Sequence, residues 1–446
     1  MSNNTEKNVE KKGLNISAKS FVTAIAVIFV LMALTYGLTF VMPGGGIPFW
    51  KWILSPMLVL GAEDNVSLIA VLVFLLVIGG VFNCLDKCGL MKYMLDKITY
   101  RFGKERYKLL ALVALFFMAM GSFIGSFEEC VPLVPIVVAL AIRLGFDALV
   151  GMGMSLLAIG CGFAAGVCNP FTVGVAQELA GLPMFSGMGF RLLSFALVYG
   201  LLVMFLSAYA KRIEKPLDMD ATENGFVLNS KMDKGLVCFA VLMVTGIGVV
   251  LSSVFVSALQ DYTMIIVAVT FLAAGIVSSL VSGMGKKLGA SFWHGLVSVL
   301  PAVLMILMAN SIKYTLVEGN ILDTILQAAV STASTLPRWA VILFIYLIVL
   351  IMNFFIASGS AKAFLLMPLI VPVAEAFGIS AQLCVIAYAF GDGFSNVFYP
   401  TNPVLLISLG LADVNYGKWV RWSLPFQLMN LVLTSGILML GLIIGY

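Results

Sequence analysis

Long apolar stretches separated by short polar segments dominate the chain. A stretch of about 20 apolar residues is long enough to cross a bilayer as a helix, whereas one of about 10–14 is not. Residues 86–108 carry charges at helical spacing and predict an amphipathic helix in the membrane interface, and residues 211–234 form a polar linker. The predicted membrane-spanning helices cover residues 21–42, 66–85, 188–210, 235–257, 262–282, 296–317 and 420–445.

The linker divides the chain, after a polar tail of residues 1–20, into two halves that resemble each other: residues 21–210 and 235–446. In each half a Gly-Ser tip precedes a proline-containing apolar arm, and a Gly-x-Gly motif and an Asn-Pro pair follow. Three matches in the same order predict an internal repeat. The matching positions are Gly125-Ser126 and Gly359-Ser360, Gly160/Gly162 and Gly391/Gly393, and Asn169-Pro170 and Asn402-Pro403.

Each tip predicts the turn of a re-entrant helical hairpin, over residues 108–145 and 338–378, because the arm after the tip is short for a full crossing. Residues 148–180 and 381–411 then carry Gly, Asn and Pro within apolar surroundings, and proline interrupts a helix there. Unwound backbone in a membrane is tolerated only inside protein or beside a water-filled cavity. Paired broken helices are typical of transporter binding sites, although glycine and proline also kink and pack helices without a binding role.

The composition supports an all-α polytopic membrane protein. Hydrophobic residues make up 61% of the chain and charged residues only 11%, against about 25% charged residues in soluble domains. A net charge of +4 is too small to suggest nucleic-acid binding. The chain has one histidine, His294, and no phosphate-binding GxxxxGK[ST] loop. We therefore expect neither a histidine-based zinc site nor ATP hydrolysis by this chain, and we expect no enzymatic activity.

The positions of the cations predict the orientation of the chain in the membrane. An N-terminus in the cytoplasm places 21 of the 26 Lys and Arg residues on the cytoplasmic side, as the positive-inside rule requires. With this orientation the two hairpins open toward opposite sides, so the repeat is inverted. The five remaining cations are Lys51, Arg191, Lys313, Arg338 and Lys362.

Three long strings carry a resemblance to a known family: NPFTVGVAQELAGLPMFSGMGFR at 169–191, NFFIASGSAKAFLLMP at 353–368 and FGDGFSNVFYPT at 390–401. With the paired glutamates of GSFEE at 125–129, they resemble the YfcC-like branch of the C4-dicarboxylate anaerobic carrier family, in the ion transporter superfamily. The resemblance implies inverted repeats, opposed hairpins, elevator-type movement, a homodimer and a bacterial cytoplasmic membrane.

The resemblance also implies a substrate class. Labels for this branch include basic amino-acid antiporter and arginine/ornithine exchanger, and related branches carry C4-dicarboxylates or aminobenzoyl-glutamate. The second tip departs from the Ser-Gly-Ser-Gly-Gln that is frequent in the family, because it ends in Lys362.

The tips and the broken helices together predict the binding site. Helix N-termini at the tips are suited to a carboxylate, and the freed backbone and polar side chains of the broken helices are suited to Na⁺. We expect sodium near Ser126, Asn169, Ser360 and Asn402, or else H⁺ as the coupling ion, and no other cofactor. The expected substrate-binding residues are Gly125, Ser126, Glu128, Glu129, Asn169, Thr172, Ser358, Gly359, Ser360, Lys362, Asp392, Asn396, Thr401 and Asn402.

The charged members of this set have alternative interpretations. Charges at membrane depth are costly and usually functional, so Glu128 and Glu129 are candidates for binding a substrate cation or a proton. Ser126-x-x-Glu129 also fits a capping box, which is a structural role. Asp392 either binds a ligand or caps backbone in a glycine turn. Lys362 pairs with an acid, binds a substrate carboxylate or replaces a coupling cation.

The leading hypothesis is a secondary transporter of amino acids, basic ones above all, by exchange or ion coupling. Its motivation is the combination of buried acids with helix ends that favour a carboxylate. The alternative is a carrier of C4-dicarboxylates or other small organic anions that uses Lys362 and the tips as anion ligands. A channel or sensor built on the same fold is the rival from a different functional class.

Overall fold

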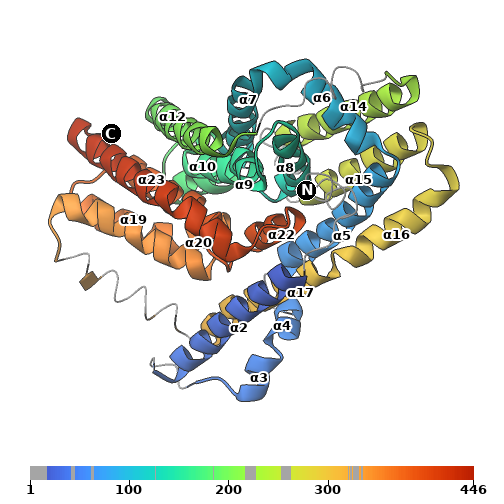
Figure 1. Cartoon of the computed structure of the whole chain (residues 1–446). Coiled ribbons are helices and arrows are strands. Elements are labelled where there is room, and N and C mark those ends of the chain that lie inside the picture. The colour runs from blue at the N-terminus through green and yellow to red at the C-terminus, as the bar shows by residue number, and fades with distance from the viewer. Residues whose placement is uncertain are drawn as a thin grey trace.

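The structure is a computed structural model, and the residues that it describes form helices and their connections (Figure 1). In that part of the chain, five helices are long and apolar enough to cross a membrane, and a bent helix pair with an angle of 73° forms a sixth candidate span. The prediction of an all-helical membrane protein is confirmed. The described residues are 18–41, 46–61, 65–125, 127–183, 185–215, 228–252, 263–319, 321, 324, 331–332 and 335–446.

A first group, the peripheral helices, contains the helices that precede α7 (Arg106–Ala119) in the first half and α19 (Arg338–Phe355) in the second half. Helix α5 packs against both α15 and α16, and α2 packs along α17 (Figure 1). Gly79 and Gly295 face each other where α5 and α16 cross, and a Cβ added at Gly79 would lie 2.6 Å from the Gly295 carbonyl oxygen. Glycine lets the two backbones approach this closely. The peripheral helices are α2 (Ala18–Val41), α3 (Phe49–Ile53), α4 (Ser55–Leu58), α5 (Asn65–Lys87), α6 (Leu90–Phe102), α14 (Ser230–Ser252), α15 (Thr263–Val281), α16 (Leu288–Ser298) and α17 (Leu300–Glu318).

A second group, the central helices, repeats one order of elements in each half: a helix, a tip, a second helix, an interrupted helix and a long final helix. In the first half these are α7 (Arg106–Ala119), α8 (Val134–Arg143), α9 (Ala148–Met152) with α10 (Ala158–Ala164) and α11 (Val175–Leu179), and α12 (Met188–Ile213). In the second half they are α19 (Arg338–Phe355), α20 (Gly359–Ala376), α21 (Ala381–Asn396) with α22 (Pro403–Leu411), and α23 (Tyr416–Ile444).

The two Gly-x-Gly motifs lie where central helices cross. One glycine of each motif, Gly162 or Gly391, packs on the helix before the tip of its own half, α7 or α19. The other glycine, Gly160 or Gly393, packs on the interrupted helix of the opposite half, and a Cβ at Gly393 would overlap the backbone of Ala164. Substitution by a larger residue would push these backbones apart, so the motifs bring the two interrupted helices together.

Two segments differ from the sequence-based prediction. The expected span over residues 296–317 is divided at Val299 between α16 and α17, because Pro301 occupies the first turn of α17, where its missing N–H is tolerated. His294, which precedes that expected span in the sequence, lies within α16. The arm after the second tip, α20, is long enough by length and composition to cross a membrane, so its length does not by itself make it re-entrant.

Candidate functional site

Each interrupted helix unwinds just before its Asn-Pro pair. The first unwinds over residues 165–169, termed break one, between α10 and the π-helical turn Pro170–Gly174 that leads into α11. The second unwinds over residues 397–402, termed break two, between α21 and α22. The two breaks therefore occupy corresponding places in the two halves.

The asparagines of the two Asn-Pro pairs cap the helices that resume after the breaks. Asn169 Oδ1 accepts hydrogen bonds from backbone N–H groups two and three residues further on, at 2.9 and 3.3 Å. Asn402 Oδ1 does the same at 2.9 and 3.4 Å. Asparagine before a proline is a favoured start for a helix, because its side chain satisfies otherwise unpaired N–H groups. Both side-chain oxygens are thus already engaged in structure.

Carbonyl groups freed by the breaks receive hydrogen bonds from the long final helices. Arg191 Nε donates to the carbonyl of Val167 in break one at 3.1 Å, and Trp419 Nε1 donates to that of Val397 in break two at 2.8 Å. Arg191 and Trp419 each stand in the fourth position of their helix, α12 or α23. Sequence reasoning gave neither residue a place in the site. The available signal was that Arg191 is one of the five cations outside the predicted cytoplasmic set.

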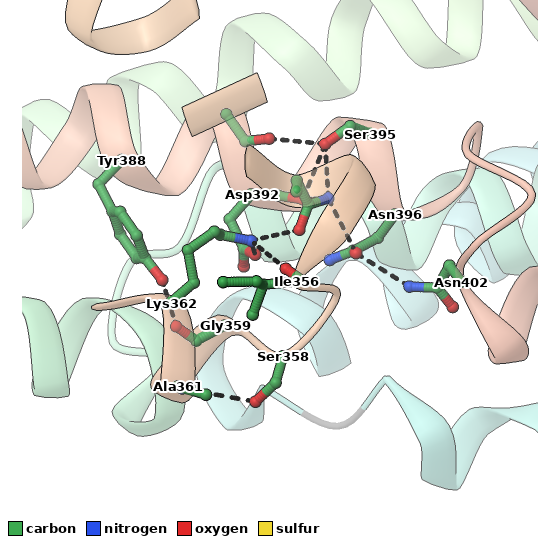
Figure 2. Close-up of polar contacts among 12 residues, drawn as sticks. Ile356, Ser358, Gly359, Ala361, Lys362, Tyr388, Asp392, Ser395, Asn396 and Asn402 are labelled. Atoms are coloured by element: carbon green, nitrogen blue, oxygen red, sulfur yellow. Dashed lines mark hydrogen bonds and ion pairs between the residues drawn. The ribbon is translucent and has the colours of Figure 1, made fainter. Parts of the chain in front are cut away.

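The centre of the second half holds a fully buried ion pair (Figure 2). Lys362, on the first turn of α20, lies with its Nζ 2.5 Å from Asp392 Oδ1 on α21. The Lys362 ammonium also donates to Asn353 Oδ1 and, at 3.2 Å, to the backbone carbonyl of Ile356. Among the interpretations of Lys362, the structure supports the one in which it pairs with an acid, and that acid is Asp392.

Asn353 connects the ion pair to break two. Its Nδ2 donates to Ser395 Oγ at 2.6 Å and to Asn396 Oδ1 at 3.0 Å. Asn396 Oδ1 also accepts from Asn402 Nδ2 at 2.9 Å, which completes a chain of amides from Lys362 to the cap of α22 (Figure 2). Sequence reasoning missed Asn353 and Ser395, although Asn353 is the only amide side chain in the largely apolar α19.

The two halves meet at the second tip. A Cβ added at Gly359 would lie 2.5 Å from Thr172 Cγ2 of the first half and 2.9 Å from Asp392 Oδ2 of the second. Thr172 Oγ1 and Asp392 Oδ2 are both buried and have no hydrogen-bond partner among the described residues. Two unpaired polar atoms, one from each half, therefore lie beside one tip glycine.

The other expected site residues take several positions. Gly125, at the first tip, has φ of +77°, and a Cβ there would overlap Asn169 Oδ1. Ser358 is exposed and caps α20 by accepting from the Ala361 N–H at 3.4 Å, while Ser360 is half-buried. The buried Oγ1 of Thr401 lacks a hydrogen-bond partner among the described residues. Asn396 and Asn402 belong to the amide chain. Ser126 and the side chains of Glu128 and Glu129 lie outside the described part of the structure.

Comparison with known sequences decides the family. The profile of the C4-dicarboxylate anaerobic carriers matches residues 53–443. The chain belongs to this family. The resemblance seen in the sequence is therefore confirmed, and the chain is a multi-pass membrane protein and a secondary transporter of small molecules rather than an enzyme.

Two curated proteins are similar along most of the chain. One is YfcC of Escherichia coli K12, which bears the provisional name of a basic amino acid antiporter; it is 29% identical over 402 residues, covering 85% of this chain and 78% of YfcC. The other is an uncharacterised protein of Haemophilus influenzae, 26% identical over 384 residues, covering 81% of this chain and 73% of that protein.

Two solved structures align with the chain at low similarity. The YdaH transporter of Alcanivorax borkumensis has a TM-score of 0.46 and 18% identity, covering 95% of this chain and 99% of that one. MtrF of Neisseria gonorrhoeae, described as one of a class of antimetabolite efflux pumps, has a TM-score of 0.44 and 15% identity, covering 93% of this chain and 94% of that one.

Proposed function

We propose that this carrier exchanges amino acids, with a preference for basic ones, by an elevator-type movement of the central helices against the peripheral helices. The provisional name of the similar E. coli protein supports the substrate class. The main support comes from the buried pair of Lys362 and Asp392, because its two members differ in what they leave free for a ligand.

Lys362 has no donor left for a substrate anion. An ammonium group carries three N–H donors, and Asn353 Oδ1, Ile356 O and Asp392 Oδ1 provide three acceptors for it. A C4-dicarboxylate that used Lys362 would therefore have to break a buried ion pair, which is strongly unfavourable.

Asp392 has the opposite property. Its Oδ2 is buried and receives no hydrogen bond from the described residues, and an unpaired buried acceptor is costly. A substrate ammonium or guanidinium group supplies the missing donor, and Thr172, whose Oγ1 is also unpaired, lies beside the same face of Gly359. This single observation carries the preference for an amino acid over a dicarboxylate.

A basic amino acid has a second cationic group and a carboxylate, and the proposal assigns each to a tip. The second cation binds Glu128 and Glu129, which follow the first tip in the sequence. The carboxylate binds backbone N–H groups at the start of α20, a helix of 18 residues whose positive dipole end lies at the exposed Ser358.

The proposal also includes a homodimer in a bacterial cytoplasmic membrane with the N-terminus inside. The distribution of Lys and Arg supports the orientation, and the family resemblance supports the dimer. Light scattering of the purified protein in detergent measures the oligomeric state, and a monomer there would refute the dimer without affecting the transport assignment.

Counterflow in proteoliposomes tests the substrate class. Vesicles loaded with unlabelled compound receive labelled arginine, ornithine, lysine, succinate or fumarate. We expect saturable uptake of the basic amino acids that internal substrate accelerates. Saturable succinate flux without amino-acid flux would make the chain a dicarboxylate carrier, and uptake without acceleration by internal substrate would indicate a channel.

Two aspartate variants test the site. Asp392→Asn is expected to lower amino-acid exchange by at least about tenfold, because a hydrogen bond to a charged group contributes about 1.5–3 kcal/mol. Asp233→Asn is the matched control, since Asp233 pairs with Lys97 of α6 at 2.5 Å in a partly exposed position. Equal exchange in both variants would remove Asp392 from the binding site.

A further inference from the structure

The Lys362 ammonium lies among oxygens of three kinds. They are the carboxylate of Asp392 at 2.5 Å, the side-chain amide of Asn353 and the backbone carbonyl of Ile356 at 3.2 Å (Figure 2). Ile356 directly follows α19, so its carbonyl lies at the negative end of an 18-residue helix. Carboxylate, amide and helix-terminal carbonyl oxygens are the ligands that transporters supply to a bound Na⁺.

These oxygens, termed the Lys362 cage, come from two structural units. Asn353 and Ile356 lie just before the second tip and Lys362 lies just after it, so all three belong to the tip region. Asp392 belongs to the interrupted helix. The ammonium therefore joins the tip region to α21. A free ion in this position would join the same two units only while it is bound.

We propose that Lys362 is a tethered cation that takes the place of a free coupling ion, so that the second tip closes onto α21 without Na⁺. This inference rests on the exchange function proposed above, but not on which substrate class is exchanged. A covalently attached cation cannot be released on either side of the membrane. A Na⁺ gradient therefore drives no transport through the Lys362 cage, and net movement follows the gradients of the exchanged substrates.

The amide chain explains how the tethered cation affects the rest of the site. Asn353 uses its oxygen for Lys362 and its nitrogen for Asn396, whose oxygen also accepts from Asn402 at the cap of α22. A charge in the cage thus orients Asn353, and Asn353 orients the two asparagines of break two. Removal of the ammonium leaves Asn353 free to turn its amide, so the break loses its alignment.

Ion replacement is the first test. Counterflow of the substrate that the uptake panel identifies is measured with Na⁺, K⁺ or choline as the only added cation on both sides. Equal exchange rates in the three media are expected. Exchange that requires Na⁺ would overturn the inference.

Chemical rescue is the second test. Lys362→Ala is expected to lose exchange in Na⁺-free medium and to regain part of it when methylammonium, which supplies the terminal carbon and the ammonium of the missing side chain, is added. Lys51→Ala is the matched control, because Lys51 pairs with Glu318 among the peripheral helices, and it should neither lose exchange nor respond to methylammonium. Wild-type exchange in Lys362→Ala, or a folded variant that methylammonium does not restore, would overturn the inference.

Thermal unfolding of the wild-type protein keeps the inference testable even when Lys362→Ala does not fold. A ligand that binds the folded state raises its stability in proportion to the logarithm of its concentration. We expect the unfolding temperature in NaCl to equal that in KCl at each concentration, and an increase with concentration that is specific to Na⁺ would contradict the tethered cation.

The results distinguish this inference from the proposed substrate class. Na⁺-independent exchange of succinate without arginine exchange would refute the amino-acid assignment and support the tethered cation. Arginine exchange that requires Na⁺ would support the assignment and refute the tethered cation.

Discussion

The two breaks share a backbone design but differ in charge. At both, an asparagine caps the helix that resumes and a side-chain N–H from the following long helix reaches a freed carbonyl. At break one that donor is the guanidinium of Arg191, and the contacts that the structure describes include no carboxylate partner for it. Break two instead has a neutral tryptophan donor and an amide chain that leads to an ion pair.

This difference separates the role of the repeat from the role of the charges. The features that recur in both halves, which are the caps, the carbonyl contacts and the Gly-x-Gly crossings, hold unwound backbone in place. In the described part of the chain, charges that form a fully buried ion pair occur in the second half only, so they are not needed to build a break. We infer that they serve the transport cycle, and three sets of variants test that division.

Removal of one member of the ion pair has the largest expected effect. Lys362→Met leaves Asp392 buried without an opposite charge, which lowers the free energy of unfolding by about 3–5 kcal/mol. The double variant Lys362→Met/Asp392→Leu should recover much of this stability but no exchange activity. Thermal unfolding and counterflow of the two variants measure both quantities, and a double variant with normal exchange would make the pair purely structural.

Removal of the carbonyl donors should affect break one more than break two. Arg191→Met loses charged hydrogen bonds to the carbonyls of Val167 and Ser186, at about 1.5–3 kcal/mol each. Trp419→Phe loses one neutral hydrogen bond, worth about 0.5–1.5 kcal/mol, and a little packing. Denaturation of the purified variants measures the difference, and equal losses would show that the charge of Arg191 adds nothing.

Removal of the caps has the smallest expected effect on stability. Asn169→Ala and Asn402→Ala should each cost about 0.5–2 kcal/mol, because each leaves helix N–H groups unpaired. Asn402→Ala should slow exchange more, since it also removes the donor to Asn396 in the amide chain. Asn169→Asp and Asn402→Asp keep the capping oxygen and serve as stability controls. Equal slowing by the two alanine variants would mean that the amide chain has no role of its own.

Local chemistry made much of the fold predictable. Apolar runs of membrane length predicted an all-helical membrane protein, which the structure and the family confirm. Asn-Pro pairs in apolar surroundings drew attention to the segments that contain the breaks, because proline and asparagine act on the backbone beside them. The division between α16 and α17 at Val299 was missed, since a proline near a helix start leaves the apolar pattern intact.

Of the candidate site, the sequence by itself determined which residues carry unusual charge at membrane depth: Glu128, Glu129, Lys362 and Asp392 stood out because they lie at the predicted tips or in a predicted broken helix. Only the tertiary structure decided that these two pair, that Asn353 and Ile356 complete the Lys362 cage, and that Thr172 reaches Gly359 from the other half. The physical reason is the distance along the chain over which each kind of interaction acts. Composition, caps and prolines act within a few residues, whereas these contacts depend on how separate helices pack, and the packing brings together positions about 190 residues apart in the chain.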